Sequence, residues 1–199
     1  MDSSNAATRR EFLGHSRHLT ATSLTLALAS QIGAHASSGS DTLKLGLVGC
    51  GGRGAGAADQ AMTADDGVQL HSACDVNRET MNRAIDILTE QQPDRIMVPQ
   101  ERRYHDFEGY KRVIAECDVV ILATSPGFRP QHFEEAVAQG KHVFMEKPVA
   151  SDVAGIKRVL EAGKAAKAKG LKVGVGLQRR HQPGYQECIK RIQDGAIGD

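Results

Sequence analysis

Two short segments of this sequence carry side chains that could do chemistry. The first is Glu146-Lys147-Pro148, in which a carboxylate and an amine follow directly after the apolar run from His142 to Met145. A short apolar run predicts a buried strand, so Lys147 would lie at the carboxyl end of that strand, where open α/β sheets bind ligands. The second segment, residues 49–54, is glycine-rich. A ligand loop and a candidate proton donor on one sheet indicate an oxidoreductase. The alternative is that Lys147 lies at an ordinary strand end and has no catalytic role.

The glycine-rich segment matches the dinucleotide-binding pattern Gly-x-Gly-x-x-Gly, since residues 49–54 read Gly-Cys-Gly-Gly-Arg-Gly. It follows a predicted strand and opens a predicted helix. The first glycine permits the tight turn, the second lets the backbone approach a pyrophosphate, and the third lets helix and strand pack closely. The helix amino terminus adds N–H groups and positive potential. The alternative is a turn without a ligand. We predict a cofactor site containing Gly49, Gly51, Gly52, Arg53 and Gly54.

A carboxylate completes this pattern. Asp75 ends the second predicted strand, 21 residues after Gly54 (75 − 54), where an acidic side chain accepts hydrogen bonds from the adenosine ribose. Its charge would repel a 2′-phosphate and therefore favours NAD over NADP. Arg78 keeps NADP open, because a guanidinium can pair with that phosphate. Asp75 also fits the N-cap of a helix, a role that Asn77 could equally fill.

The loop after the fourth predicted strand offers two hydroxyl groups to the same site. It reads Thr124-Ser125-Pro126-Gly127, and in a doubly wound sheet this loop also faces the cofactor. Thr124 and Ser125 could therefore bond ribose or phosphate. The pair Pro126-Gly127 is equally typical of an ordinary turn.

Alternating strand and helix patterns predict the elements that position these residues. The run from Asp118 to Thr124 is β-branched and almost wholly apolar, as expected of a strand buried on both faces. Alternation of this kind implies parallel strands with right-handed crossovers, and therefore an α/β, doubly wound Rossmann sheet. Residues 92–103 have the composition of a polar loop. The strands are predicted at residues 43–48, 68–74, 118–124, 142–145 and 171–177, and helices at residues 77–91, 107–116, 131–139 and from 151 onward.

Composition excludes several other classes of protein. The formal net charge of the 199 residues is +1 and there is no tryptophan, which argues against a nucleic-acid partner. None of the four cysteines is paired at Cys-x-x-Cys spacing, so no metal site is expected. Three of them, Cys50, Cys74 and Cys117, fall at predicted strand ends, where a small buried residue fits.

The amino terminus predicts export. Arg9 and Arg10 form a twin-arginine signature before an apolar stretch, and Ala34-His35-Ala36 follows as a cleavage pattern. We therefore predict a signal peptide over residues 1–36, a linker over 37–42 and a periplasmic location; the alternative is an amphipathic helix on a cytosolic protein. The apolar stretch is too short and too rich in Thr and Ser for a stable membrane span of about 20 residues.

These residues together resemble the glucose-fructose oxidoreductase, inositol dehydrogenase and rhizopine-catabolism (Gfo/Idh/MocA) family. The most specific match is residues 140–148, Gly-Lys-His-Val-Phe-Met-Glu-Lys-Pro. The resemblance implies hydride transfer between a nicotinamide cofactor and a sugar, polyol or related carbonyl. It implies that Lys147 contacts the substrate hydroxyl and assists proton transfer, that Glu146 lies near the nicotinamide, and that a cis-type bend occurs at Pro148. A cationic lysine would stabilise the alkoxide that forms.

The sequence departs from the family in two respects. Many members carry Asn-x-x-His after the fourth strand, whereas residues 126–132 of this chain read Pro-Gly-Phe-Arg-Pro-Gln-His. His132 is therefore either a cofactor contact or a helix residue packed on the sheet. The family's second, α+β domain is expected to be missing or only begun: residues 43–178 form the NAD(P)-binding domain and 179–199 the start of the next. Two alternatives to the dehydrogenase are an NAD-dependent glycosidase of the same family and an inactive nucleotide-binding fragment. An uncovered sheet would also promote homo-oligomers.

Overall fold

Six parallel strands form one sheet in the order β3-β2-β1-β4-β5-β6, in the part of the chain that the computed structural model describes, residues 42–198. The chain reverses its direction of travel across the sheet between β1 and β4, which creates the switch point of a doubly wound fold. This confirms the predicted Rossmann sheet. The predicted signal peptide lies outside the described residues. The strands are β1 Leu43–Val48, β2 Val68–Cys74, β3 Arg103–Tyr104, β4 Val119–Leu122, β5 His142–Met145 and β6 Val173–Val175.

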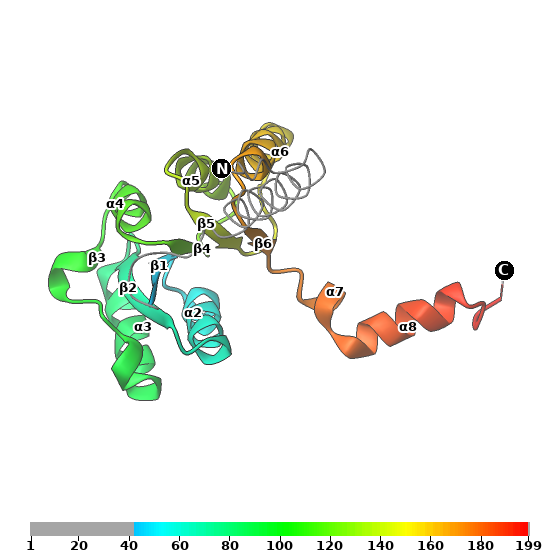
Figure 1. Cartoon of the computed structure of the whole chain (residues 1–199), viewed down its shortest axis with the longest axis horizontal. Coiled ribbons are helices and arrows are strands. Elements are labelled where there is room, and N and C mark those ends of the chain that lie inside the picture. The colour runs from blue at the N-terminus through cyan, green and yellow to red at the C-terminus, as the bar shows by residue number, and fades with distance from the viewer. Residues whose placement is uncertain (1–41, 199) are drawn as a thin grey trace, which may run out of the picture. The chain divides into compact units, whose positions relative to one another are not determined.

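Helices cover both faces of the sheet, as Figure 1 shows. One face packs against α2 and α3 and the other against α4, α5 and α6, each through its own cluster of buried side chains. Neighbouring residues of β4 point into opposite clusters: Ile121 joins the α2–α3 side, and Val120 and Leu122 join the other. This explains why β4 is apolar throughout. The helices are α2 Gly52–Ala64, α3 Arg78–Gln91, α4 Gly109–Glu116, α5 Arg129–Ala138 and α6 Val153–Ala168.

One strand was missed by the sequence patterns. The segment 92–103, expected to be a polar loop, contains two 3-10 turns, Pro93–Arg95 and Gln100–Arg102, and the first residue of β3. Because β3 has only two residues, it is too short to show the alternation on which a strand prediction depends. The strands predicted at 118–124 and 171–177 exist but are shorter, as β4 and β6.

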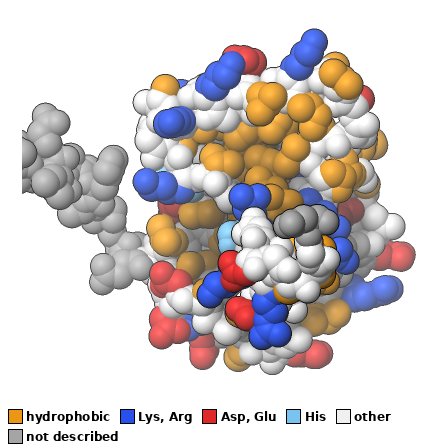
Figure 2. Space-filling model, turned by 90° about the vertical axis from the view of Figure 1, so that its right-hand side faces the viewer, with side chains coloured by type: hydrophobic (Ala, Val, Ile, Leu, Met, Phe, Trp, Pro, Cys, Tyr) orange, Lys and Arg blue, Asp and Glu red, His pale blue; other side chains and the backbone are white. Residues whose placement is uncertain are grey.

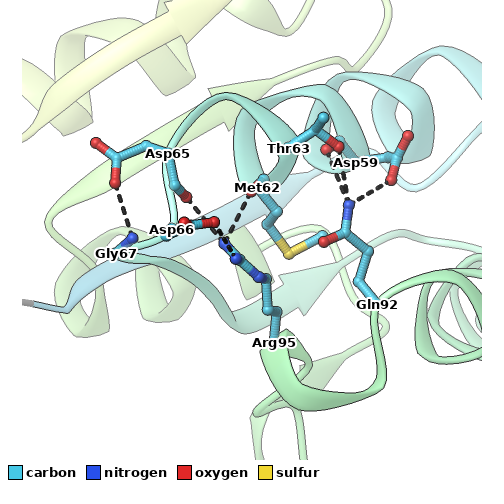
Figure 3. Close-up of polar contacts among 8 residues, drawn as sticks. All are labelled: Asp59, Met62, Thr63, Asp65, Asp66, Gly67, Gln92 and Arg95. Atoms are coloured by element: carbon cyan, nitrogen blue, oxygen red, sulfur yellow. Dashed lines mark hydrogen bonds and ion pairs between the residues drawn. The ribbon is translucent and has the colours of Figure 1, made fainter.

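Polar side chains fix the carboxyl end of α2, the helix that follows the glycine-rich loop (Figure 3). Arg95 donates to the carbonyl oxygens of Met62 and Asp65, both at 2.9 Å, and pairs with the carboxylate of Asp66 at 2.5 Å. These carbonyls have no partner within the helix, so the guanidinium both satisfies them and complements the negative helix end. Gln92 adds a hydrogen bond of 2.8 Å to Asp59. The carboxyl-terminal half of α2 is thereby tied to the segment after α3.

Beyond β6 the chain forms α7 Gln178–His181 and α8 Pro183–Gln193, and neither helix contains a buried residue. Figure 2 views the side of the molecule on which these helices lie and shows hydrophobic side chains gathered in one area, with Lys and Arg around it. This exposed apolar surface agrees with the expectation of an uncovered face. Self-association stays a prediction. The large hydrophobic residues exposed in α6, in β6 and in the loop between β6 and α7 are Val153, Ile156, Leu160, Val173 and Leu177.

Candidate functional site

The glycine-rich loop has the geometry that a pyrophosphate-binding turn requires. Gly49 has a φ of +95°, and a Cβ added there would lie 2.7 Å from the backbone nitrogen of Thr124. A Cβ on Gly54 would lie 2.0 Å from the carbonyl oxygen of Gly49, so the helix can approach the strand only because Gly54 has no side chain. A Cβ on Gly51 or Gly52 would meet nothing within 4 Å. The loop is therefore tight toward the protein and open on its outer side.

The amino terminus of α2 is free to bind an anion. Gly51 is its N-cap residue, and no side chain of the described residues caps it. The first N–H groups of the helix therefore keep their hydrogen-bonding capacity and the positive potential of the helix end. Open space beside Gly51 and uncapped N–H groups fit the pyrophosphate of a dinucleotide.

Asp75 lies directly after β2 and is fixed to the same loop. One carboxylate oxygen accepts a hydrogen bond of 2.8 Å from the N–H of Cys50, and the other accepts one of 2.9 Å from the N–H of Asn77. The helix cap of α3 is Asn77 and not Asp75, because the Asn77 side chain accepts from the N–H of Thr80. The competing explanation for Asp75 as an N-cap is therefore excluded, and its half-buried carboxylate is aligned with the glycine-rich loop.

A cavity of about 340 Å³ joins these features. Its walls come from the glycine-rich loop, the end of β2, the loop before α4, the end of β4 and the first turn of α5. It thus collects six of the predicted site residues from segments far apart in the sequence, and adds aromatic and acidic side chains that were not predicted. The lining residues are Val48, Gly49, Gly51, Cys74, Asp75, Val76, Asp106, Phe107, Glu108, Tyr110, Ala123, Thr124, Ser125, Phe128, Gln131 and His132.

His132 lines the cavity and is also a buried residue of α5. Its Nδ1 lies 3.1 Å from the hydroxyl of Thr124, and its ring lies 4.2 Å from the ring centroid of Tyr110. Burial, reinforced by the charge of Arg129, lowers the pKa of His132 from 6.5 to about 4. The imidazole is therefore neutral at neutral pH and fixes the Thr124 hydroxyl at the cavity wall.

The Lys147 end of the site is more exposed. The Lys147 side chain is exposed and lines a shallow hollow shared with residues 176–180, separate from the cavity around Asp75. The Lys147–Pro148 peptide bond is cis, as the family resemblance implied. Arg78, a predicted cofactor contact, is not among the residues that line the cavity, and its guanidinium lies 2.7 Å from Nε2 of His105. Burial raises the pKa of Cys74 to about 12, so that thiol stays protonated.

A profile of an oxidoreductase family, Gfo/Idh/MocA, described by its NAD-binding Rossmann fold, matches residues 43–177. The chain belongs to this family. The match covers the glycine-rich loop, Asp75 and Lys147, and it confirms the predicted NAD-binding Rossmann domain.

Inositol dehydrogenases are among the proteins to which this chain is similar. Inositol 2-dehydrogenase from Gluconacetobacter diazotrophicus is 30% identical over 160 residues, which are 79% of this chain and 43% of that protein. A structure of scyllo-inositol dehydrogenase from Lactobacillus casei, with bound cofactor NAD(H) and scyllo-inositol, has a TM-score of 0.61 and 27% identity over 79% of this chain and 43% of that one. The chain thus spans less than half the length of these relatives.

Arg129 is a site residue of this family member that the sequence patterns missed. It begins α5, and its side chain is buried, with 3% of the residue exposed. One terminal nitrogen donates to the carbonyl oxygens of Glu146, at 2.6 Å, and of Pro148, and the other donates to the carbonyl oxygen of Thr124. The two carbonyls on either side of Lys147 are therefore held by one guanidinium. Burial lowers the pKa of Arg129.

Two further observations concern membrane-spanning helices and metal sites. Among the residues that the structure describes, no helix is long and apolar enough to cross a membrane. Within the same range, no three His, Cys, Asp or Glu side chains are grouped so that they could hold a metal ion.

Proposed function

We propose that this chain supplies the NAD-binding half of an oxidoreductase that transfers hydride between NAD and a polyol or sugar. One observation carries the proposal: the cavity bounded by the glycine-rich loop and Asp75 and the exposed amine of Lys147 occupy the same carboxyl edge of the sheet. In open α/β sheets this edge is where ligand and reacting groups meet. The names of the relatives support a polyol as the substrate class.

The chain's own residues divide this task. The N–H groups at the start of α2 would hold the pyrophosphate, and the carboxylate of Asp75 would accept hydrogen bonds from the ribose. Thr124, fixed by His132, would add a hydroxyl contact. When bound, NAD supplies the hydride acceptor. The amine of Lys147 would stabilise the alkoxide of the substrate and assist transfer of its proton.

Enzyme assays on the oxidoreductase of which this chain would be the NAD-binding half test this function. We expect NADH to accumulate when NAD and an inositol are supplied, and we expect Lys147→Met to reduce turnover by about a hundredfold or more while changing the dissociation constant for NAD less than about threefold. Lys157→Met, which alters a lysine of α6 outside the site, is the matched control. Release of an aglycone from a glycoside without net NADH would contradict the proposal and favour an NAD-dependent glycosidase.

We also propose that the protein is exported by the twin-arginine route. The order of Arg9-Arg10, the apolar stretch and Ala34-His35-Ala36 supports this. Export of a folded protein would let the chain leave the cytosol with NAD already bound. Replacing both arginines by lysine should leave the protein in the cytosolic fraction and unprocessed. Detection of the doubly replaced protein in the periplasmic fraction would contradict the proposal.

A further inference from the structure

An ion pair joins the glycine-rich loop to the Glu146-Lys147-Pro148 segment. The guanidinium of Arg53 contacts one carboxylate oxygen of Glu146 through both Nε and a terminal nitrogen, each at 2.8 Å. Arg53 is the second residue of α2, and its side chain is 54% exposed, whereas that of Glu146 is 7% exposed. The hydrogen bond that Arg53 donates to Glu146 raises the pKa of Arg53. A predicted cofactor contact therefore already has an anionic partner.

The buried carboxylate of Glu146 depends on this arginine. Among the described residues, Arg53 is the only group that hydrogen-bonds to it. Gly176 closes the other side, since a Cβ there would lie 2.8 Å from a carboxylate oxygen. Arg129 faces Glu146 as well, but its hydrogen bond goes to the carbonyl oxygen. A buried carboxylate without its partner is costly, so the position of Arg53 decides how much negative charge Glu146 presents.

A dinucleotide would compete with Glu146 for Arg53. The side chain begins in the first turn of α2, where the uncapped N–H groups offer a place for pyrophosphate. A guanidinium pairs with phosphate as well as it pairs with carboxylate. Asp75 lies after β2, and Glu146 lies after β5, on the opposite side of the switch point. A dinucleotide with its ribose at Asp75 extends across the switch point toward Glu146.

We propose that Arg53 is shared between Glu146 and the pyrophosphate, and that this competition couples the two ends of the cofactor site. When Arg53 turns toward the pyrophosphate, the carboxylate of Glu146 loses part of its neutralising charge. Glu146 then favours the cationic ring of NAD⁺ over the neutral ring of NADH. Glu146 is thus a specificity-determining residue for the redox state of the cofactor. The inference rests on the proposed function insofar as the ligand is NAD.

Binding constants measured by calorimetry on the whole chain test the coupling without any turnover. We expect Glu146→Gln to tighten ADP-ribose about fivefold, because Arg53 is released for the pyrophosphate. Arg53→Met should weaken ADP-ribose about tenfold, and the double variant should show no gain from Glu146→Gln. The two single variants should also move the preference for NAD⁺ over NADH in opposite directions, down for Glu146→Gln and up for Arg53→Met.

The matched control is a second arginine–glutamate pair on the surface. Arg158 pairs with Glu134 between α6 and α5, away from the cavity, so Arg158→Met and Glu134→Gln should leave all three nucleotide constants unchanged. Arg53 is half exposed, so its variant gives a result even if Glu146→Gln fails to fold. An unchanged or weaker ADP-ribose affinity in Glu146→Gln would overturn the coupling, as would an unchanged NAD⁺ preference in Arg53→Met. An oxidoreductase containing this chain that binds NAD but transfers no hydride would overturn only the proposed function.

Discussion

The Asp75 end and the Lys147 end of the candidate site are built in different ways. Around Asp75, backbone groups set the geometry: the carboxylate accepts from two N–H groups, and a cavity has already formed. Around Lys147, the backbone is fixed by Arg129, yet the amine itself is exposed. In this chain the part that would bind the cofactor is therefore assembled in advance, while the group that would do chemistry faces solvent.

The largest effect should come from Arg129, which holds the backbone at the Lys147 end through its hydrogen bonds. Arg129→Met removes a buried cation and leaves the carbonyl oxygens of Thr124, Glu146 and Pro148 without their donor. We expect the free energy of unfolding to fall by about 3–5 kcal/mol, measured by urea denaturation. Arg158→Met, which breaks only a half-exposed ion pair, should cost less than about 1 kcal/mol. Equal losses in the free energy of unfolding for the two variants would show that the hydrogen bonds of Arg129 do not stabilise this end.

A somewhat smaller effect on stability is expected at the Asp75 end. Gly54→Ala forces a methyl group against the carbonyl oxygen of Gly49, so α2 must move away from β1. We expect a loss of about 3 kcal/mol in stability and of about a hundredfold in NAD affinity. Gly56→Ala lies in the same helix and meets nothing within 4 Å, and it should stabilise the protein by about 0.5–1 kcal/mol. Similar NAD affinities in both variants would contradict the role of the tight turn.

The smallest effect concerns His132, which ties the cavity wall to α5. The pKa of His132 is about 4 in the folded protein, whereas its ordinary value, which applies to the unfolded chain, is 6.5. Between pH 4 and pH 6.5 the unfolded chain therefore binds more protons than the folded protein. The contribution of neutral His132 to the free energy of unfolding is fully present above about pH 6.5. On acidification to pH 5 the free energy of unfolding should decrease by about 2 kcal/mol. Denaturation curves at both pH values for the wild type and His132→Gln measure it. A wild-type slope that persists in the variant would assign the effect elsewhere.

The sequence was informative where the backbone imposes the residue type. Gly49 and Gly54 are required by a positive φ and by a close approach, and such requirements appear in the sequence as a fixed spacing. Asp75 was found for the same reason, because it ends a strand at a set distance from the loop. These positions follow from local rules, and the structure placed each of them as expected.

The sequence was uninformative where the contact is long-range and side-chain based. Arg129 stands alone between Phe128 and Pro130, and nothing in that context shows that it reaches the carbonyl oxygens of another strand. Arg53 was assigned to the cofactor from its place in the loop, but its partner Glu146 is 93 residues away. Pairings of this kind depend on the strand order, which local patterns do not specify.

Titration of NAD into the purified chain tests the central claim, that the cofactor site is assembled in the described residues. The account predicts saturable binding of one NAD per chain, weakened about tenfold by Asp75→Ala because the ribose loses its acceptor. Arg78→Ala should bind NAD as the wild type does, since that side chain is engaged by His105. Absence of saturable NAD binding to the wild-type chain, or equal affinities for the wild type and Asp75→Ala, would contradict the account.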